Sequence, residues 1–328
     1  MRRREFAAFL GCAAAAWPLA ARARQKAMPI IGWVGAGSPS PFAARLATLR
    51  QGLADTGYVE GQNVVIEYRW AEGHYDRFPA LVADLVGRKV DLIMTQGAAV
   101  GALEAKRATS TTPIVFISGG DPVAEGLVAS LAHPGGNLTG ISWLAVDLMP
   151  KLVELLFELV PRAKAIAMLV NPRNHAASGP AASAAEQAVN SKRGELHVIY
   201  ASTGAEIDTA FVALANLHPD GLIVGPDPFF GARHEQLVAS AARYAIPAAY
   251  DTREYTIAGG LISYGADLTA ASRQLGIYAG RILKGERPAD LPVQQPTKFE
   301  LVINLKTARA LGLTLPQSLL ARADEVTE

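Results

Sequence analysis

The sequence has a single cysteine, Cys12, no surplus of charge and no long apolar run in its body. One cysteine excludes an internal disulfide and a cysteine-based zinc or iron–sulfur site. A net charge of +1 gives no basic surplus for neutralising phosphates, so no nucleic-acid partner is expected. Without an apolar run of about 18 residues, the body of the chain is not expected to cross a membrane.

Motifs of common enzyme classes are also missing. The 6 His show no H-x-x-x-H spacing, and there is no G-x-S-x-G elbow and no G-x-x-x-x-G-K-[ST] phosphate loop. These absences argue against a catalytic residue, a metal ligand and a bound cofactor. An active site assembled from distant positions would leave no such motif, so the alternative stays open.

The first 23 residues differ in kind from the rest. Three arginines, Arg2 to Arg4, precede an alanine-rich apolar run over 7–21, and Ala21-Arg22-Ala23 follows. A cationic start, a short apolar run and an Ala-x-Ala exit are typical of a secretory signal peptide, which predicts a periplasmic protein. Arg3-Arg4 also fits the twin-arginine export pattern. An amphipathic helix or an uncleaved anchor is the alternative interpretation.

The remaining chain repeats a strand–helix pattern. Short apolar runs bounded by turn formers alternate with helix-period segments, one of them predicted over 124–131. Runs in the first half begin at 30, 64, 91, 113 and 138, and matching runs in the second half begin at 166, 196, 221, 247 and 261. The spacing is thus 123 to 136 residues throughout, which favours two similar lobes.

This alternation predicts the fold class. Parallel strands need a crossover, so the sequence indicates an α/β protein whose two lobes are each a parallel sheet with helices on both faces. Ligands of such sheets bind beyond the carboxyl ends of the strands. The residues that follow each predicted strand are therefore the candidate site residues.

Small and polar residues follow the strands of the first lobe. Gly35-Ala36-Gly37 begins like a dinucleotide fingerprint, but Ser40 stands where the third glycine belongs, so a tight turn is the better interpretation. We expect the hydroxyls and amides of this edge to hold an anionic group; the candidates are Ser38, Thr95, Gly97 and Ala98.

Carboxylates, amides and aromatic rings complete the candidate site. Asp121 and Asp227 each precede a proline, where they would pair with a ligand ammonium or simply cap a helix. Ser142 and Asn171 would add polar contacts. Aromatic side chains that could stack on a ligand are Trp70, Tyr75, Tyr250 and Tyr264, of which Trp70, Tyr250 and Tyr264 are the predicted ligand contacts. Together these residues suit a cleft that closes on a small molecule.

Several phrases of the sequence resemble one family over nearly the whole chain. They are GYVEG at 57–61, EYRWAEG at 67–73, GGDP at 119–122, PGGNLTG at 134–140 and PTKFELVIN at 296–304. In these phrases and its N-terminal segment the chain resembles the substrate-binding components of ABC transporters, in a branch that includes tryptophan-uptake binding proteins.

The resemblance implies a type I periplasmic-binding-protein fold with three crossovers between the lobes. It also implies a protein that is not an enzyme and that delivers its ligand to a membrane permease. It implies a first lobe of 29–146 plus 259–289 and a second of 147–258 plus 290–328. A monomer is expected, and an aromatic amino acid or carboxylate is the favoured ligand. Two other functions need similar pockets: a ligand-sensing domain for a membrane regulator, and an exported α/β enzyme acting on a small acid.

Overall fold

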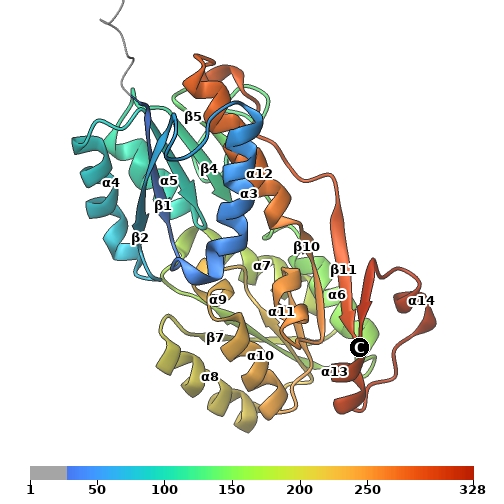
Figure 1. Cartoon of the computed structure of the whole chain (residues 1–328). Coiled ribbons are helices and arrows are strands. Elements are labelled where there is room, and N and C mark those ends of the chain that lie inside the picture. Colours follow the sequence, from blue (N-terminus) through green and yellow to red (C-terminus); the bar gives the residue numbers. More distant parts are fainter. Residues whose placement is uncertain (1–27) are drawn as a thin grey trace, which may run out of the picture.

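The computed structural model describes residues 28–328, which form two lobes, each built around one sheet (Figure 1). The predicted signal peptide over 1–23 lies outside the described residues. No helix in the described part of the chain is long and apolar enough to span a membrane.

The first lobe contains a parallel five-stranded sheet in the order β2-β1-β3-β4-β5. Its strands are β1 (Ile30–Gly35), β2 (Val65–Trp70), β3 (Leu92–Gln96), β4 (Ile114–Ser118) and β5 (Leu138–Ser142). Its helices are α3 (Ala43–Asp55), α4 (Phe78–Gly87), α5 (Ala99–Ala108) and α12 (Leu268–Leu283), with short turns η1 (Ser40–Phe42), η2 (Tyr75–Arg77) and η3 (Pro288–Asp290).

Both faces of this sheet are covered, as the predicted fold class requires. One face packs on α3 and α12 through leucines spaced for a helix, including Leu46, Leu49 and Leu53. The other face packs on α4 and α5. The helices α3 and α12 approach closely because Gly52 has no side chain; a Cβ there would lie 1.9 Å from the Arg273 carbonyl oxygen.

The second lobe contains a seven-stranded sheet in the order β12-β11-β10-β9-β8-β6-β7. Its strands are β6 (Ala165–Val170), β7 (Glu195–Tyr200), β8 (Gly221–Val224), β9 (Ala248–Tyr250), β10 (Ile262–Ala266), β11 (Phe299–Asn304) and β12 (Glu325–Thr327). Its helices are α6 (Met149–Leu159), α7 (His175–Ser191), α8 (Gly204–Leu217), α9 (Pro228–Gly231), α10 (His234–Arg243), α11 (Arg253–Ile257), α13 (Leu305–Ala310) and α14 (Gln317–Leu320).

The duplication is confirmed by strand order. The order β2-β1-β3-β4-β5 in the first lobe is repeated by β7-β6-β8-β9-β10 in the second, and all ten strands lie within two residues of their predicted positions. The second lobe adds β11, which pairs antiparallel to β10, and the C-terminal strand β12. The predicted fold class is thereby confirmed, with one antiparallel pair added to it.

Two details differ from the sequence predictions. The predicted helix over 124–131 is wrong, because the segment folds as turns; Gly126 takes a φ of 71°, which a right-handed helix cannot contain. The implied lobe boundaries are also displaced. β10 belongs to the second sheet, so the chain returns to the first lobe after Ala266 rather than at 259, and Gln294 still pairs with the first sheet beside Ile141.

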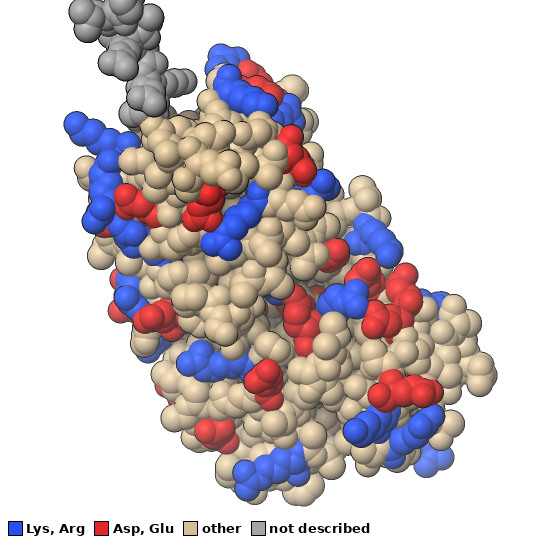
Figure 2. Space-filling view, in the orientation of Figure 1, with Lys and Arg blue, Asp and Glu red and all other residues tan. Residues whose placement is uncertain are grey.

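The chain passes between the sheets three times, after β5, after β10 and before β11. The carboxyl ends of both sets of parallel strands therefore face the space between the lobes (Figure 1). On the face drawn in Figure 2, acidic and basic side chains are interspersed.

A cleft between the lobes as the candidate binding site

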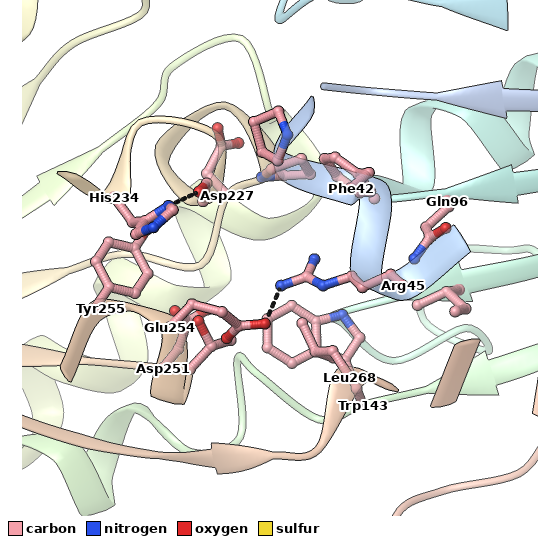
Figure 3. A pocket seen from close by; sticks show the side chains of 16 residues that line it. Phe42, Arg45, Gln96, Trp143, Asp227, His234, Asp251, Glu254, Tyr255 and Leu268 are labelled. Atoms are coloured by element: carbon pink, nitrogen blue, oxygen red, sulfur yellow. Dashed lines mark hydrogen bonds and ion pairs between the residues drawn. The ribbon is translucent and has the colours of Figure 1, made fainter. Parts of the chain in front are cut away.

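A cavity lies between the two lobes (Figure 3). The first lobe lines it with Pro41, Phe42, Arg45, Gln96, Gly97, Ile117, Trp143 and Leu268. The second lobe lines it with Asp227, Pro228, Gly231, His234, Asp251, Thr252, Glu254 and Tyr255.

The lobes touch each other beside this cavity. Gly97, after β3, has a φ of 121°, and a Cβ there would lie 2.9 Å from the Ala36 Cβ and 3.0 Å from the Pro228 Cγ of the other lobe. A Cβ at Gly73 would lie 2.8 Å from a ring carbon of Phe229, again across the lobes. The absence of these two side chains lets the lobes meet, so the structure represents a closed form.

Aromatic rings from both lobes form the apolar walls. Phe42 and Trp143 come from the first lobe and Tyr255 from the second, and all three are at least nine-tenths buried. Trp70 packs behind Phe42 with its ring centroid 5.8 Å away, and Tyr250 stacks on Tyr255 with the centroids 4.5 Å apart. Such a chamber suits a flat apolar group between rings.

An ion pair in the cavity lining joins the two lobes. The Arg45 Nη2 lies 2.9 Å from the Glu254 Oε1, and the two residues come from different lobes. Burial raises the pKa of Glu254, but the neighbouring guanidinium more than offsets it, so this pKa is lower than usual and the carboxylate is ionised.

Asp251 is the least compensated charge in the cavity. The residue is 3% exposed, and no side chain within 28–328 donates a hydrogen bond to it; its own backbone N–H is the donor at hand. Burial, reinforced by the negative charge of Glu254, raises the pKa of Asp251 to about 7. A cationic group entering the cavity would find this carboxylate free.

Asp227 is in the opposite situation, although it also lines the cavity. Its Oδ1 accepts from the Asn171 side chain at 3.0 Å and from the backbone N–H of Phe229 at 2.9 Å. Its Oδ2 accepts from the Tyr75 hydroxyl at 2.8 Å and from the Asn174 side chain at 2.9 Å. Burial keeps the pKa of Asp227 raised even though these side-chain donors lower it.

These four bonds give Asp227 two structural roles. It caps α9, as one of the two sequence interpretations allowed, and it accepts a hydrogen bond from the other lobe. The pKa of Tyr75 is well above its usual value because of burial and the nearby Asp227 charge, so its hydroxyl remains a donor. Asn171 contacts Asp227 rather than the open cavity.

Of the eleven predicted ligand contacts, Gly97 and Asp227 line the cavity. Trp70 and Tyr250 form the second layer described above. Thr95 and Ala98 flank the Gln96-Gly97 turn; both are buried, and the Thr95 hydroxyl has no hydrogen-bond partner. Ser38 is partly exposed at the end of β1 and outside the cavity lining.

Three predicted residues are engaged elsewhere. Ser142 is fully buried and donates to the Gly120 carbonyl oxygen. Asp121 is exposed, and its carboxylate accepts from the backbone N–H of Val123. Tyr264 stacks on Phe299 with the ring centroids 6.0 Å apart. None of the three lines the cavity, because local turns and the second-lobe sheet use these side chains.

Sequence reasoning missed most of the polar lining. Arg45 lies in the first turn of α3, ten residues after β1 ends, and no pattern in the sequence distinguishes it from a solvated helix charge. Glu254 and Tyr255 follow β9 within the first turn of α11, so a search extended a few residues past each strand would find them. The Nδ1 of His234, at the start of α10, donates to the Gly231 carbonyl oxygen at 2.9 Å. Within residues 28–328 no three His, Cys, Asp or Glu are grouped to hold a metal ion.

Known proteins resemble this chain over most of its length. A tyrosine-binding protein of Clostridioides difficile is 29% identical over 264 residues, which is 80% of this chain and 74% of that protein. A crystal structure described as a conserved domain protein from Vibrio cholerae superposes with a TM-score of 0.83 at 28% identity, covering 92% of this chain and 100% of that one.

A second solved structure contains a ligand. The ABC domain from Streptococcus pneumoniae in complex with L-Trp superposes with a TM-score of 0.79 at 26% identity, covering 90% of this chain and 99% of that one. Residues 39–327 match the sequence model of the family described as ABC transporter substrate binding protein. That match confirms the resemblance found in the sequence, and the chain belongs to the family of ABC transporter substrate-binding proteins.

Proposed function

We propose that this protein captures an aromatic amino acid between its two lobes and delivers it to the membrane permease of an ABC transporter. The observation that carries the proposal is one cavity with aromatic walls from both lobes and charges of both signs at its edge. A zwitterion with a ring matches each of these features.

The aromatic part of the ligand is supported by Phe42, Trp143 and Tyr255. Their rings stand on different lobes, so a flat side chain would contact both lobes only in the closed form. A ligand that contacts both lobes binds the closed form more tightly than the open one, which is the condition for ligand-driven closure. The ammonium end of the ligand is supported by the Asp251 carboxylate, which lies in the same lining as the Arg45–Glu254 ion pair.

The named ligands of two relatives point the same way. The Clostridioides difficile relative is called a tyrosine-binding protein, and the Streptococcus pneumoniae structure contains L-Trp. We extend the proposal to export and to the mature protein. Residues 1–23 direct export to the periplasm by the twin-arginine route. The mature protein acts as a monomer without catalysing a reaction or binding nucleic acid.

A thermal-shift screen of the purified protein tests the ligand class. The compounds are the twenty amino acids, aromatic acids, purines and sugars, and isothermal titration follows each stabilising compound. We expect tryptophan, tyrosine or phenylalanine to raise the melting temperature most, because binding to the folded state stabilises it by mass action. Stabilisation by a sugar or a purine, with no response to any aromatic amino acid, would refute the proposal.

A further inference from the structure

The cavity offers a ligand one free charge, and that charge is negative. Asp227 accepts two hydrogen bonds on each oxygen, and Glu254 is paired with Arg45. Arg45 is the only Lys or Arg among the described lining residues, and its guanidinium already binds a carboxylate. Asp251 alone is a buried carboxylate that no side chain of the described chain satisfies.

We infer that Asp251 binds the ammonium group of the ligand, so that the site selects aromatic compounds by their amine and not by their carboxylate. The inference rests on the proposed function and narrows it. Aromatic amino acids bind, decarboxylated aromatic amines also bind, and deaminated aromatic acids do not. The sequence offered Asp121 and Asp227 for this role; neither has a carboxylate that is both buried and free.

The position of Asp251 is fixed by the second-lobe sheet. It directly follows β9, and a Cβ at Gly265 of β10 would lie 1.7 Å from the Asp251 carbonyl oxygen, so the two backbones are in close contact. Tyr250, the preceding residue, is buried and stacked on Tyr255. The backbone that carries this carboxylate is therefore held in place before the ligand arrives, next to the aromatic wall (Figure 3).

The charges explain the expected ranking of ligands. An ammonium supplies several N–H donors to a buried carboxylate, and such charge-assisted bonds are among the strongest in proteins. A deaminated acid brings a further negative charge towards Asp251 and Glu254, and its carboxylate must take Arg45 from Glu254. A decarboxylated amine loses only its contact with a guanidinium that is already paired.

Isothermal titration with three matched compounds tests this. The unmodified protein is titrated with L-tryptophan, tryptamine and indole-3-propionate, and with L-tyrosine, tyramine and 3-(4-hydroxyphenyl)propionate. We expect each amine to bind within about 100-fold of its amino acid, and each deaminated acid to bind at least about 1,000-fold more weakly. Binding of the acid as tight as that of the amino acid, or no binding of the amine, would overturn the inference.

Asp251→Asn tests the residue itself. This variant should bind the amino acid and the amine about 30-fold or more weakly, because one partner of a buried charge pair is removed. Its affinity for the deaminated acid should be unchanged or higher. Asp121→Asn is the matched control at an exposed strand-end aspartate and should change nothing. Unaltered amine binding by Asp251→Asn overturns the assignment, and if that variant does not fold, the ranking on the unmodified protein decides.

The outcomes separate this inference from the proposed function. Binding of aromatic amino acids together with their deaminated acids overturns the inference and leaves the function intact. Binding of aromatic amines without any amino acid overturns the function and supports the role of Asp251. Failure of all six compounds to bind counts against both.

Discussion

The hydrogen bond between Tyr75 and Asp227 joins the two lobes across a buried contact, and its removal gives the sharpest test of closure. In the closed form the Tyr75 hydroxyl donates to the Asp227 Oδ2 at 2.8 Å, while Tyr75 itself is 4% exposed and outside the cavity lining. Tyr75→Phe deletes this one oxygen and keeps the ring that packs on Phe78.

The size of the effect follows from what each state loses. In an open form, water would replace both partners, so the net contribution of the bond to closure is about 1–2 kcal/mol rather than its full strength. Asp227 keeps its other donors from Asn171, Asn174 and the Phe229 backbone, which prevents a larger penalty. At 1.4 kcal/mol per tenfold, the Kd should rise by roughly 5- to 30-fold.

The factor by which Kd rises in Tyr75→Phe should be the same for every ligand, because Tyr75 acts on the ratio of closed to open protein and does not touch the ligand. Isothermal titration with two ligands measures it, and small-angle scattering of the free and ligand-bound variant reports the lobe opening. Tyr264→Phe is the matched control, since Tyr264 is partly exposed and stacks within the second lobe. An unchanged Kd for Tyr75→Phe, or a change for one ligand only, would refute the reasoning.

Three other variants test the cleft. Burial raises the pKa of the Asp251 carboxyl to about 7, and Arg45, Glu254, Asp227 and His234 also face the cavity, so the ligand-free protein should lose stability as pH rises from about 4 to 7 and its ligand affinity should fall below about pH 7. Both pH dependences should disappear in Asp251→Asn. Thermal melts and titrations at pH 5 to 8 measure them, and a slope that persists in the variant contradicts the assignment. Gly97→Ala places a Cβ against Ala36 and Pro228 at a φ of 121°, so urea unfolding should show a loss of about 1–3 kcal/mol in the free energy of unfolding, and ligand binding should weaken as well. The control Gly136→Ala, with nothing within 4 Å of its Cβ, should be close to neutral, and equal losses in the two variants would contradict the contact. Trp143 lines the cavity, whereas Trp33 and Trp70 lie behind it. The change in tryptophan fluorescence on binding a ligand without an indole should therefore largely disappear in Trp143→Phe, and an undiminished change would place the ligand elsewhere.

Much of the fold could be predicted because its signals are local. Each parallel strand is a short apolar run that is buried on both faces, so its position shows in a few consecutive residues, such as 114–118. The repeated spacing of those runs predicts the two lobes. The helix predicted over 124–131 failed because Gly126 has a positive φ that composition alone does not reveal.

The sequence by itself determined the strands, the duplication and the edge of each sheet where a ligand belongs. Which side chains meet there was decided by tertiary structure alone. Arg45 and Glu254 are 209 residues apart in the chain, and Tyr75 and Asp227 are 152 apart. Asp121 and Asp251 are both aspartates after a strand, yet one is exposed and the other buried. Burial, which only the packed fold sets, and not residue type decides how strongly each carboxylate needs a partner.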